Sequence, residues 1–309
     1  MKKAAVLCCA WQVLSHSMSR FTAIVLLVAF SCSARAGSGA AVPWTTYEAE
    51  AMTTTGLTLG PQYSPNVVAS EASGRKCVQI GGTGQYVQFT ALAAANSMVV
   101  RYSIPDAAAG GGVDSTISLY KNGVLQGKLP VTSRYSWLYG AYPFTNSPAS
   151  GVPRNFFDEV RTNGLTISAG DVIRLQKDAT DTSSYYIIDL VDLENVPSAL
   201  TQPANSLSIM SYGAGGAGAT DDTAALVSCV SAANSQGKSV WLPPGTYKIT
   251  STVSLPSNIA IRGAGMWYST LAGDASVYGT AGRRVALNGN GSNIQLADFA
   301  ILGLSLIHI

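Results

Sequence analysis

Histidine is nearly absent from this sequence. Only His16 and His308 occur among 309 residues, one in the first segment and the other next to the last residue. The body of the chain therefore offers no imidazole, which excludes Ser-His-Asp and Cys-His catalysis and the usual ligand sets of zinc hydrolases. Any chemistry carried by this chain must use carboxylates, lysine, arginine or tyrosine.

Charged residues are also scarce, at 12% against 47% hydrophobic residues, so the chain can bury a core. The net charge is +2, but four basic residues and no acid fall in the first 36 positions: Lys2, Lys3, Arg20 and Arg35. The remainder carries 15 basic and 17 acidic groups, a net charge of −2. A nearly neutral chain without a basic run is not expected to bind nucleic acid.

Cysteine is rare outside the first segment. Of five cysteines, only Cys77 and Cys229 lie beyond position 36. Their spacing does not imply a disulfide, and we expect two separate buried thiols.

The first 36 residues have the pattern of a secretory signal peptide. The apolar run Phe21–Phe30 is too short to span a membrane, and Ala34-Arg35-Ala36 is an A-x-A cleavage pattern. We expect cleavage after Ala36, a secreted extracellular protein and no membrane attachment after cleavage. Met18 is the natural start of this signal, so residues 1–17 are either a false upstream start or an extended n-region. A signal anchor is the weaker alternative.

Residues 37–196 show the pattern of an antiparallel β domain. Alternating apolar runs bounded by turn residues predict strands at Lys76–Ile80, Tyr86–Thr90, Ser97–Ile104, Ser115–Tyr120, Val124–Pro130, Val172–Lys177 and Tyr185–Leu193. Asn122-Gly123 predicts a type I′ hairpin, and Asn163-Gly164 predicts another turn. Many short strands in roughly 150 residues are typical of a sandwich or jelly roll.

A different pattern follows a Pro/Ser/Ala linker at 197–208. Glycine-rich residues 213–218 precede an amphipathic helix, with Thr220 or Asp221 as N-cap and Gly237 as its end. Short strands are then predicted at Ser239–Leu242, Thr246–Ile249, Val253–Leu255 and Ile259–Arg262. The glycine segment lacks the Gly-Lys-Ser/Thr ending of a P-loop, which argues against nucleotide binding. A helix before evenly punctuated short strands indicates a solenoid of stacked coils.

Two phrases in this region, YGAGGAGATDDTAAL and SQGKSVWLPPGTYKI, resemble the opening of the pectate-lyase-like right-handed parallel β-helix superfamily. The resemblance implies that the helix caps the first coil and that Pro243-Pro244-Gly245 forms its corner. The expected fold is therefore all-β: a β-jelly-roll sandwich over 37–196, followed by the capped N-terminal coils of a right-handed parallel β-helix over 209–303.

The segments YEAEAM, from Tyr47, and YYIIDLVDLENV, from Tyr185, resemble the first and last strands of carbohydrate-binding modules of families 6, 35 and 36. That resemblance implies a jelly roll with one structural Ca²⁺, for which Glu48, Glu50 and Asp189 match the ligand positions. Calcium is a hard cation that takes several oxygen ligands, so the residue types agree. Alternatively, Glu48 and Glu50 are ordinary exposed acids on one strand face. Asp192 and Glu194 form a second candidate pair.

Sugar-binding modules need aromatic rings for the apolar face of a pyranose and polar groups for its hydroxyls. The densest aromatic stretches are SRYSWLYGAYPF, from Ser133, and NFFDEVR, from Asn155. The candidate carbohydrate-binding residues are Tyr135, Trp137, Tyr139, Tyr142, Asp158 and Arg161. We expect Trp137 or Tyr142 to be exposed, although half of these aromatics can equally serve the core.

These two stretches, together with SNIQLADFAILG from Ser292, resemble family 87 glycoside hydrolases, the α-1,3-glucanases and mycodextranases. The resemblance implies hydrolysis of α-1,3-glucan, or of mixed α-1,3/α-1,4-glucan, by inversion, in a protein expected to be a monomer. It also places the catalytic acids on coils beyond Gly303, so we assign no catalytic residue and expect an inactive fragment. The alternatives are a non-catalytic carbohydrate-binding or adhesive protein, and a polyuronate lyase or epimerase built on the same β-helix.

The final residues 304–309 read LSLIHI, which matches the in-frame translation of a transposon-end sequencing adapter. We therefore expect the natural chain to diverge after Gly303.

Overall fold

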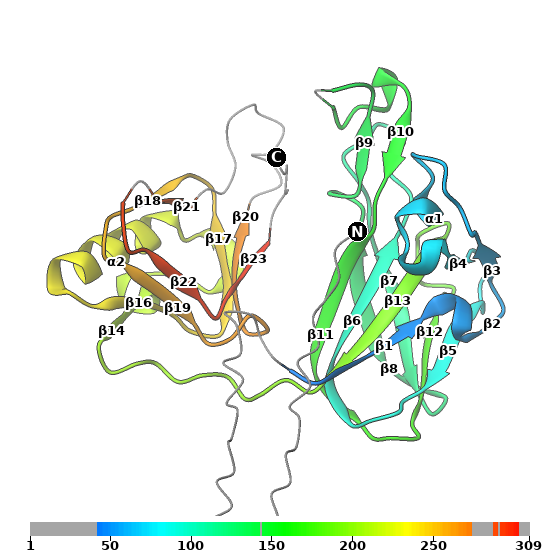
Figure 1. Ribbon diagram of the computed structural model, residues 1–309, viewed down its shortest axis with the longest axis horizontal. Coiled ribbons are helices and arrows are strands. Elements are labelled where there is room, and N and C mark those ends of the chain that lie inside the picture. Colours follow the sequence, from blue (N-terminus) through cyan, green and yellow to red (C-terminus); the bar gives the residue numbers. More distant parts are fainter. Residues whose placement is uncertain (1–41, 143, 274–286, 290, 303–309) are drawn as a thin grey trace, which may run out of the picture. The chain divides into compact units, whose positions relative to one another are not determined.

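A computed structural model describes residues 42–142, 144–273, 287–289 and 291–302. All of them belong to one compact unit, Gly37–Ile309, and the chain is mostly β (Figure 1). The predictions of a signal peptide at 1–36 and an adapter-derived tail at 304–309 fall outside the described residues. Across the described ranges, no helix is long and apolar enough to cross a bilayer.

Residues 44–194 form two antiparallel sheets. The first has the order β11 (Asp158–Ile167), β6 (Ala95–Ser103), β13 (Tyr186–Glu194), β4 (Cys77–Ile80) and β3 (Leu57–Leu59), with β1 (Trp44–Glu48) also paired to β13. The second has the order β2 (Thr53–Thr54), β5 (Tyr86–Thr90), β12 (Val172–Gln176), β7 (Asp114–Lys121) and β8 (Val124–Thr132). A small third sheet pairs β9 (Trp137–Tyr139) with β10 (Pro153–Asn155).

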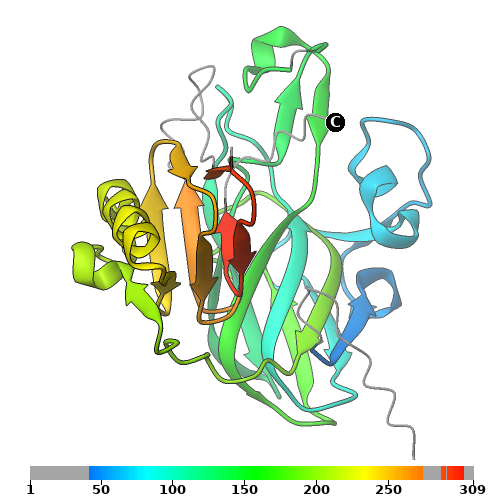
Figure 2. The same cartoon turned by 60° about the vertical axis from the view of Figure 1, so that its left-hand side comes forward.

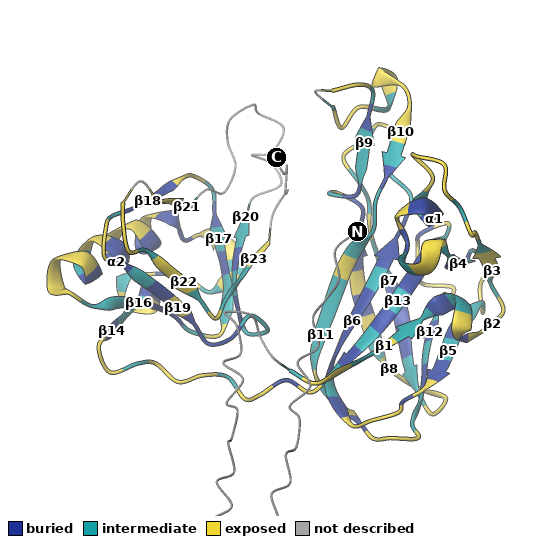
Figure 3. Cartoon of the chain, in the orientation of Figure 1, coloured by how far each residue is buried: buried dark blue, intermediate teal, exposed yellow. Residues whose placement is uncertain are grey.

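Alternation along the strands explains why these two sheets share one core. In β5 and β12, for example, Val87, Phe89, Ile173 and Leu175 are buried, whereas the residues between them are less buried (Figure 3). Side chains two apart on a strand share a face, so each strand contributes one apolar face to the common core. The sandwich expected from the alternation is therefore the architecture observed.

The turn predictions in this part had different outcomes. Asn122 and Gly123 both have positive φ, at 51° and 80°, and join β7 to β8 as the type I′ prediction requires. The turn predicted at Asn163-Gly164 is wrong. Both residues lie within β11, where the register with β6 shifts after Asn163 and Gly164 adopts φ 75°. The glycine thus marks an irregularity inside a strand.

Short helical segments connect the strands of the sandwich: η1 (Ala49–Ala51), α1 (Val68–Glu71), η2 (Ser73–Arg75) and η3 (Pro148–Ser150). Two of them, η1 and η2, lie near the point where β13 changes partner. Strand β13 pairs with β4 over Tyr186–Ile188 and with β1 over 190–194, and Asp189 between these stretches pairs with neither.

Residues 206–302 form three parallel sheets. The first has the order β14 (Ser206–Ser208), β16 (Ser239–Leu242), β19 (Ala260–Gly263) and β22 (Gln295–Ala297). The second has the order β15 (Ala217–Asp221), β17 (Gly245–Ile249), β20 (Ser269–Gly273) and β23 (Ala300–Leu302). The third pairs β18 (Val253–Leu255) with β21 (Leu287–Gly289). Each sheet takes one strand from each successive turn of the chain, which is the pairing that stacked coils produce.

A single long helix, α2 (Thr223–Gln236), covers one end of these strands after the short η4 (Ile209–Tyr212). In Figure 2 the yellow helix lies against the orange strands, and it contacts β14, β16 and β18. Its buried face supplies Leu226, Cys229, Val230 and Ala233 to the second core, whereas Val227 is exposed. Gly237 ends the helix in the left-handed conformation, as predicted.

The predicted N-cap of α2 is wrong by one or two residues. The glycine-rich segment does not remain a loop: its end forms β15 and pairs with β17, so extended backbone continues to Asp221. Asp222 is the N-cap, and Asp221 accepts hydrogen bonds from the backbone N–H of Thr223 at 3.0 Å and from its hydroxyl at 2.5 Å. The Asp221 side chain therefore serves the start of the helix, whereas Asp222 Oδ1 accepts from the Gly215 backbone N–H at 2.7 Å.

The two described cysteines are free and buried, so the prediction of separate thiols is confirmed. Burial, together with the nearby charges of Asp189 and Glu50, raises the pKa of Cys77 to about 12. Burial alone raises the pKa of Cys229 to about 11. Neither thiol is therefore reactive at neutral pH.

Stacking of the last described coil depends on the absence of a side chain at Gly263. A Cβ there would lie 2.2 Å from the Asp298 carbonyl oxygen and 2.7 Å from Phe299 Cβ. Gly263→Ala is expected to lower the free energy of unfolding by about 1–3 kcal/mol, because backbone must move to admit the methyl group. Urea unfolding measures this loss. Gly81→Ala is the control, because its Cβ would meet nothing closer than 3.7 Å, and an equal loss there would contradict the stacking argument.

Candidate functional site

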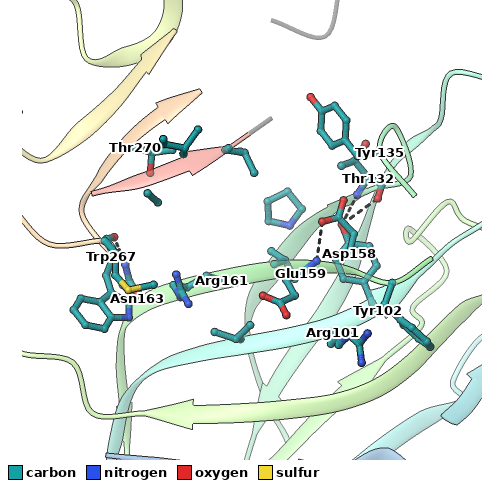
Figure 4. A pocket seen from close by; sticks show the side chains of 18 residues that line it. Arg101, Tyr102, Thr132, Tyr135, Asp158, Glu159, Arg161, Asn163, Trp267 and Thr270 are labelled. Atoms are coloured by element: carbon teal, nitrogen blue, oxygen red, sulfur yellow. Dashed lines mark hydrogen bonds between the residues drawn. The ribbon is translucent and has the colours of Figure 1, made fainter. Parts of the chain in front are cut away.

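A cavity of about 770 Å³ lies beside β11 (Figure 4). One side is formed by β11 and neighbouring residues of the sandwich, and the other by Met266, Trp267, Thr270 and β23. Polar and aromatic side chains line it: Arg101, Tyr102, Thr132, Tyr135, Asp158, Glu159, Arg161, Asn163 and Trp267. Such a mixture of rings and hydrogen-bonding groups suits a polar ligand with apolar faces.

Strand β11 positions the polar residues of this pocket by simple alternation. Glu159, Arg161 and Asn163 are two apart, so they share one face of the strand. Across the ladder, Glu159 is opposite Arg101 on β6, which brings a second guanidinium to the same region. The pocket therefore combines carboxylates and guanidinium groups on neighbouring strands.

Arg161 and Asp158 both keep hydrogen-bonding capacity that the described residues do not use. The Nε atom of Arg161 is buried without a hydrogen-bond acceptor among the described residues, and the nearest carboxylate oxygen, on Glu194, is 3.6 Å away. Asp158 accepts a hydrogen bond at 2.8 Å from the backbone N–H of Glu159. Burial nevertheless raises the pKa of Asp158, with a smaller contribution from the Glu159 charge. Both groups can therefore still bond a ligand.

The opposite wall is held by hydrogen bonds to a turn between β19 and β20. Trp267 Nε1 donates to Glu194 Oε2 at 2.9 Å, and Asn163 Nδ2 donates to the Trp267 carbonyl at 2.6 Å. Tyr268 donates its hydroxyl hydrogen to the Pro197 carbonyl at 2.7 Å. The Trp267 side chain and the backbone of the turn are thus both fixed by hydrogen bonds.

The structure brings together only three of the six predicted carbohydrate-binding residues. Tyr135, Asp158 and Arg161 line the cavity, and Trp137, Tyr139 and Tyr142 do not. Trp137 is half-buried and donates through Nε1 to the Ile104 carbonyl at 2.9 Å. Either Trp137 or Tyr142 was expected to be exposed, and Tyr142 is the exposed residue, at 74%.

Tyr139 does not fit its predicted role in carbohydrate binding, because its ring is buried and cannot present a face to a sugar in this structure. Its hydroxyl donates to Asp106 Oδ2 at 2.8 Å, and it is the last residue of β9, opposite Pro153 of β10. Burial and the Asp106 carboxylate together raise its pKa to about 12. Tyr139 is therefore part of the local core.

The three predicted calcium ligands lie in one region but are not equivalent. Asp189 is fully buried, forms an ion pair with Arg101, and accepts from the Ser73 backbone N–H at 2.9 Å. Burial raises the pKa of Asp189 to about 6, although Arg101 and the Ser73 N–H act in the opposite direction. Glu48 Oε1 accepts from the Ser73 hydroxyl at 2.8 Å.

Glu48 Oε2 and Glu50 Oε2 are both buried, and neither accepts a hydrogen bond from any residue that the structure describes. Unpartnered buried carboxylate oxygens suit a hard cation such as Ca²⁺. However, in the described part of the chain no three acidic, histidine or cysteine side chains converge as a ready ligand set. The two glutamates therefore offer oxygen ligands that suit a cation, whereas the Asp189 carboxylate is already paired with Arg101.

Comparison with known families identifies the sandwich. Residues 41–196, half of the chain, match the family model described as α-1,3-glucanase catalytic domain D1. The chain belongs to the α-1,3-glucanase catalytic-domain family. Residues 206–297 of this glucanase-family chain match a second model, described as rhamnogalacturonase A/epimerase, pectate lyase-like. A search among curated proteins found no match.

Solved α-1,3-glucanase structures agree with this assignment. The catalytic unit of the thermostable GH87 α-1,3-glucanase from Streptomyces thermodiastaticus strain HF3-3 is 36% identical, over 85% of this chain and 44% of that one, with a TM-score of 0.70. The Agl-KA catalytic domain is 32% identical over 77% and 43%, with a TM-score of 0.70. A GH87 α-1,3-glucanase catalytic domain solved with nigerose is 30% identical over 78% and 43%, with a TM-score of 0.64. The present chain thus spans less than half the length of these structures.

The glucanase assignment bears on how residues 37–196 are understood. The model that matches residues 41–196 is described as domain D1 of an α-1,3-glucanase catalytic domain, and the carbohydrate-binding module expected at 37–196 stays a prediction. Asn163 was not predicted as a pocket residue, although it alternates with Glu159 and Arg161 along one strand. Trp267 carried no local signal, because it reaches the pocket from a turn about a hundred residues farther along the chain.

Proposed function

We propose that this chain is the N-terminal part of a secreted family 87 hydrolase of α-1,3-glucan, or of mixed α-1,3/α-1,4-glucan, and acts as a monomer. The match of residues 41–196 to the α-1,3-glucanase catalytic domain carries this proposal. We further infer that the sandwich is a jelly roll and that the parallel strands begin a right-handed β-helix capped by α2. The one-strand-per-coil pairing supports the second inference.

Within this proposal, the pocket beside β11 binds glucan. A glucan is uncharged, and each pyranose has hydroxyls that both donate and accept hydrogen bonds around an apolar face. Arg161 supplies donors and Asp158 supplies acceptors, while Tyr135 contributes an aromatic ring to the lining. The relative solved with nigerose, and in other structures with tetrasaccharides, shows that members of the family bind such ligands.

Hydrolysis by inversion requires an acid and a base carboxylate about 6.5–9.5 Å apart. We place these groups in the part of the family structures that this chain does not span, and we assign no described carboxylate to the reaction. Aspartate-to-alanine variants of one relative were solved with bound saccharides, which supports aspartates as the catalytic groups. The 309-residue chain alone is therefore expected to release no reducing sugar from α-1,3-glucan.

Retention on polysaccharide tests the binding proposal. The full chain is expected to co-sediment with insoluble α-1,3-glucan and not with pectin. Arg161→Ala should weaken retention about tenfold, because it removes the unpaired donors of the pocket. Arg174→Ala is the matched control, since Arg174 stacks on Tyr86 in the other sheet and does not line the pocket. Equal loss in both variants would point to a general effect on folding.

Retention on pectin alone would favour the second candidate, a polyuronate lyase or epimerase. The description of the model matching residues 206–297 is the observation that supports this alternative.

We also propose that Ca²⁺ binds in the sandwich through Glu48 and Glu50, with Asp189 nearby. When bound, the ion would neutralise the two unpartnered carboxylate oxygens and link β1 and η1 to the neighbouring η2 segment. Calcium at about 1 mM, after removal of metal by a chelator, is expected to raise the melting temperature by several degrees. Glu48→Gln should abolish most of this shift. No shift in the unmodified protein would remove calcium from the proposal.

A further inference from the structure

One carboxylate oxygen connects three elements beside the pocket. Glu194 is the last residue of β13, and its Oε2 accepts from Trp267 Nε1 at 2.9 Å. The same oxygen lies 3.4 Å from the Ser97 hydroxyl oxygen, whose hydrogen goes to Asn163 Oδ1 at 2.8 Å, and 3.6 Å from Arg161 Nε. The Glu194 side chain is only 13% exposed, so these interactions are made largely out of water. Interactions of a charge are stronger in such surroundings.

We infer that Glu194 is the positioning residue of this pocket, holding the Arg161 guanidinium and the Trp267 indole in fixed places on its two walls. The inference rests on the proposed saccharide binding by the pocket and goes beyond it by assigning the residue that organises the site. Glu194 does not itself line the cavity, so it acts on a ligand through Arg161 and Trp267.

Arg161 needs such a partner. A free arginine side chain loses rotamer entropy when it is fixed, and either the protein or the ligand must supply the interaction that offsets this loss. The Nε atom of Arg161 forms no hydrogen bond to a described residue. Glu194 is the one ion-pair partner of Arg161 in the described part of the chain. Figure 4 shows Arg161 lying between Trp267 and Glu159 along the pocket. Attraction to Glu194 therefore orients this guanidinium before a saccharide arrives, which improves affinity.

The backbone of the Trp267 turn does not depend on Glu194. Asn163 Nδ2 bonds the Trp267 carbonyl at 2.6 Å, and the Ser97 hydroxyl donates to Asn163 Oδ1 at 2.8 Å. These bonds remain when the Glu194 charge is removed. The expected consequence of a change at Glu194 is therefore misplacement of two side chains, with little change in stability.

The decisive experiment compares saccharide affinity with stability in Glu194→Gln. Titration calorimetry of the full chain with an α-1,3-linked tetrasaccharide is expected to show about tenfold weaker binding than the unmodified protein. Its melting temperature should change by no more than about 2 °C, because the backbone of the Trp267 turn keeps its hydrogen bond to Asn163. Asp192→Asn is the matched control: Asp192 lies two residues earlier on β13 and accepts from the Thr46 hydroxyl at 2.6 Å, away from the pocket. Its affinity should be unchanged.

Trp267→Phe provides a second test, because it keeps a ring and removes the donor to Glu194. It should also weaken saccharide binding. A purely structural role for Glu194 predicts the opposite pattern, with a lower melting temperature and unchanged affinity of the folded protein. Wild-type affinity in Glu194→Gln would overturn the inference and leave the proposed glucan binding intact. Absence of tetrasaccharide binding by the unmodified chain would reject the proposed function, and the inference with it.

Discussion

Replacing Asp181 by alanine is expected to lower the free energy of unfolding by about 3–5 kcal/mol, one of the largest effects of any single change in this chain. The Asp181 side chain is fully buried, and it lies in the loop that links β12 to β13. Its two oxygens accept from donors on three segments: the Thr116 hydroxyl at 2.6 Å, the Lys128 ammonium, the Ser118 hydroxyl at 2.8 Å and the Asp178 backbone N–H at 2.8 Å. Alanine would leave all four donors without their acceptor.

The charge of Asp181, as well as its shape, contributes to this stability. Burial acts to raise its pKa, but Lys128 and the hydroxyl donors outweigh that effect and hold the pKa below its ordinary value of 3.8. A carboxylate whose folded-state pKa is depressed adds stability above its unfolded pKa and loses it as the pH falls through the folded value. Asp181→Asn should therefore destabilise the protein at pH 7 and make little difference near pH 2.

Chemical unfolding at these two pH values measures both effects. Asp114→Asn is the control, because the Asp114 side chain is exposed and forms its ion pair with Arg134 at the surface. A loss below about 1 kcal/mol for Asp181→Ala at pH 7 would show that water replaces the missing acceptor and would contradict the argument.

Much of the architecture could be predicted because local chemistry determines it. The Asn122-Gly123 hairpin needs positive φ at both positions, and the end of α2 needs it at Gly237. The strands Ser239–Leu242 and Val253–Leu255 were predicted with the bounds observed, since each is a short apolar run between turn residues. In contrast, the start of α2 depends on pairing between β15 and β17, which involves residues far apart in the sequence.

The pocket shows more clearly the same difference between features set by local sequence and features set by contacts between distant segments. Arg161 and Asp158 could be predicted as hydrogen-bonding groups because they follow an aromatic stretch, and both line the cavity. Glu194 was considered only as a member of a metal-binding pair with Asp192, because sequence shows two acids on one strand face and not what faces them. Its actual partners are Trp267, Ser97 and Arg161. Packing between distant segments decides such roles, and no local pattern reports it.

Arg101→Gln is the second change for which we expect a large effect, a loss of about 3 kcal/mol at pH 8 when metal is removed by a chelator. Asp189 is the extra residue of a β-bulge: Ile188 is opposite Tyr102 and Leu190 is opposite Arg101, so Asp189 has no partner in the ladder. The bulge directs its carboxylate into a fully buried place, where Arg101 is its counter-ion. Arg101 also lies 4.9 Å from the Phe157 ring centroid, which helps to hold it there.

The pH dependence of this loss has a definite sign. The folded-state pKa of Asp189 is raised from 3.8 to about 6, so the protonated form is favoured by folding and stability falls as the pH rises through this interval. Removing Arg101 takes away a charge that lowers the pKa, and it therefore moves the folded value higher still. The difference between Arg101→Gln and the unmodified protein should then be smaller at pH 5, where Asp189 binds a proton, than at pH 8.

A second substitution separates the lost ion pair from lost packing. In Arg101→Gln/Asp189→Asn position 189 no longer carries a buried charge that has lost its counter-ion, so most of the stability at pH 8 should return. Arg174→Gln removes a guanidinium stacked on Tyr86 with no carboxylate partner, and it should cost less than about 1 kcal/mol.

Calcium adds a further comparison. If the ion binds at Glu48 and Glu50, its charge can replace that of Arg101, and it should stabilise Arg101→Gln more than the unmodified protein. Equal losses at pH 5 and pH 8, with no recovery in the double variant, would instead show that Arg101 acts through packing on Phe157.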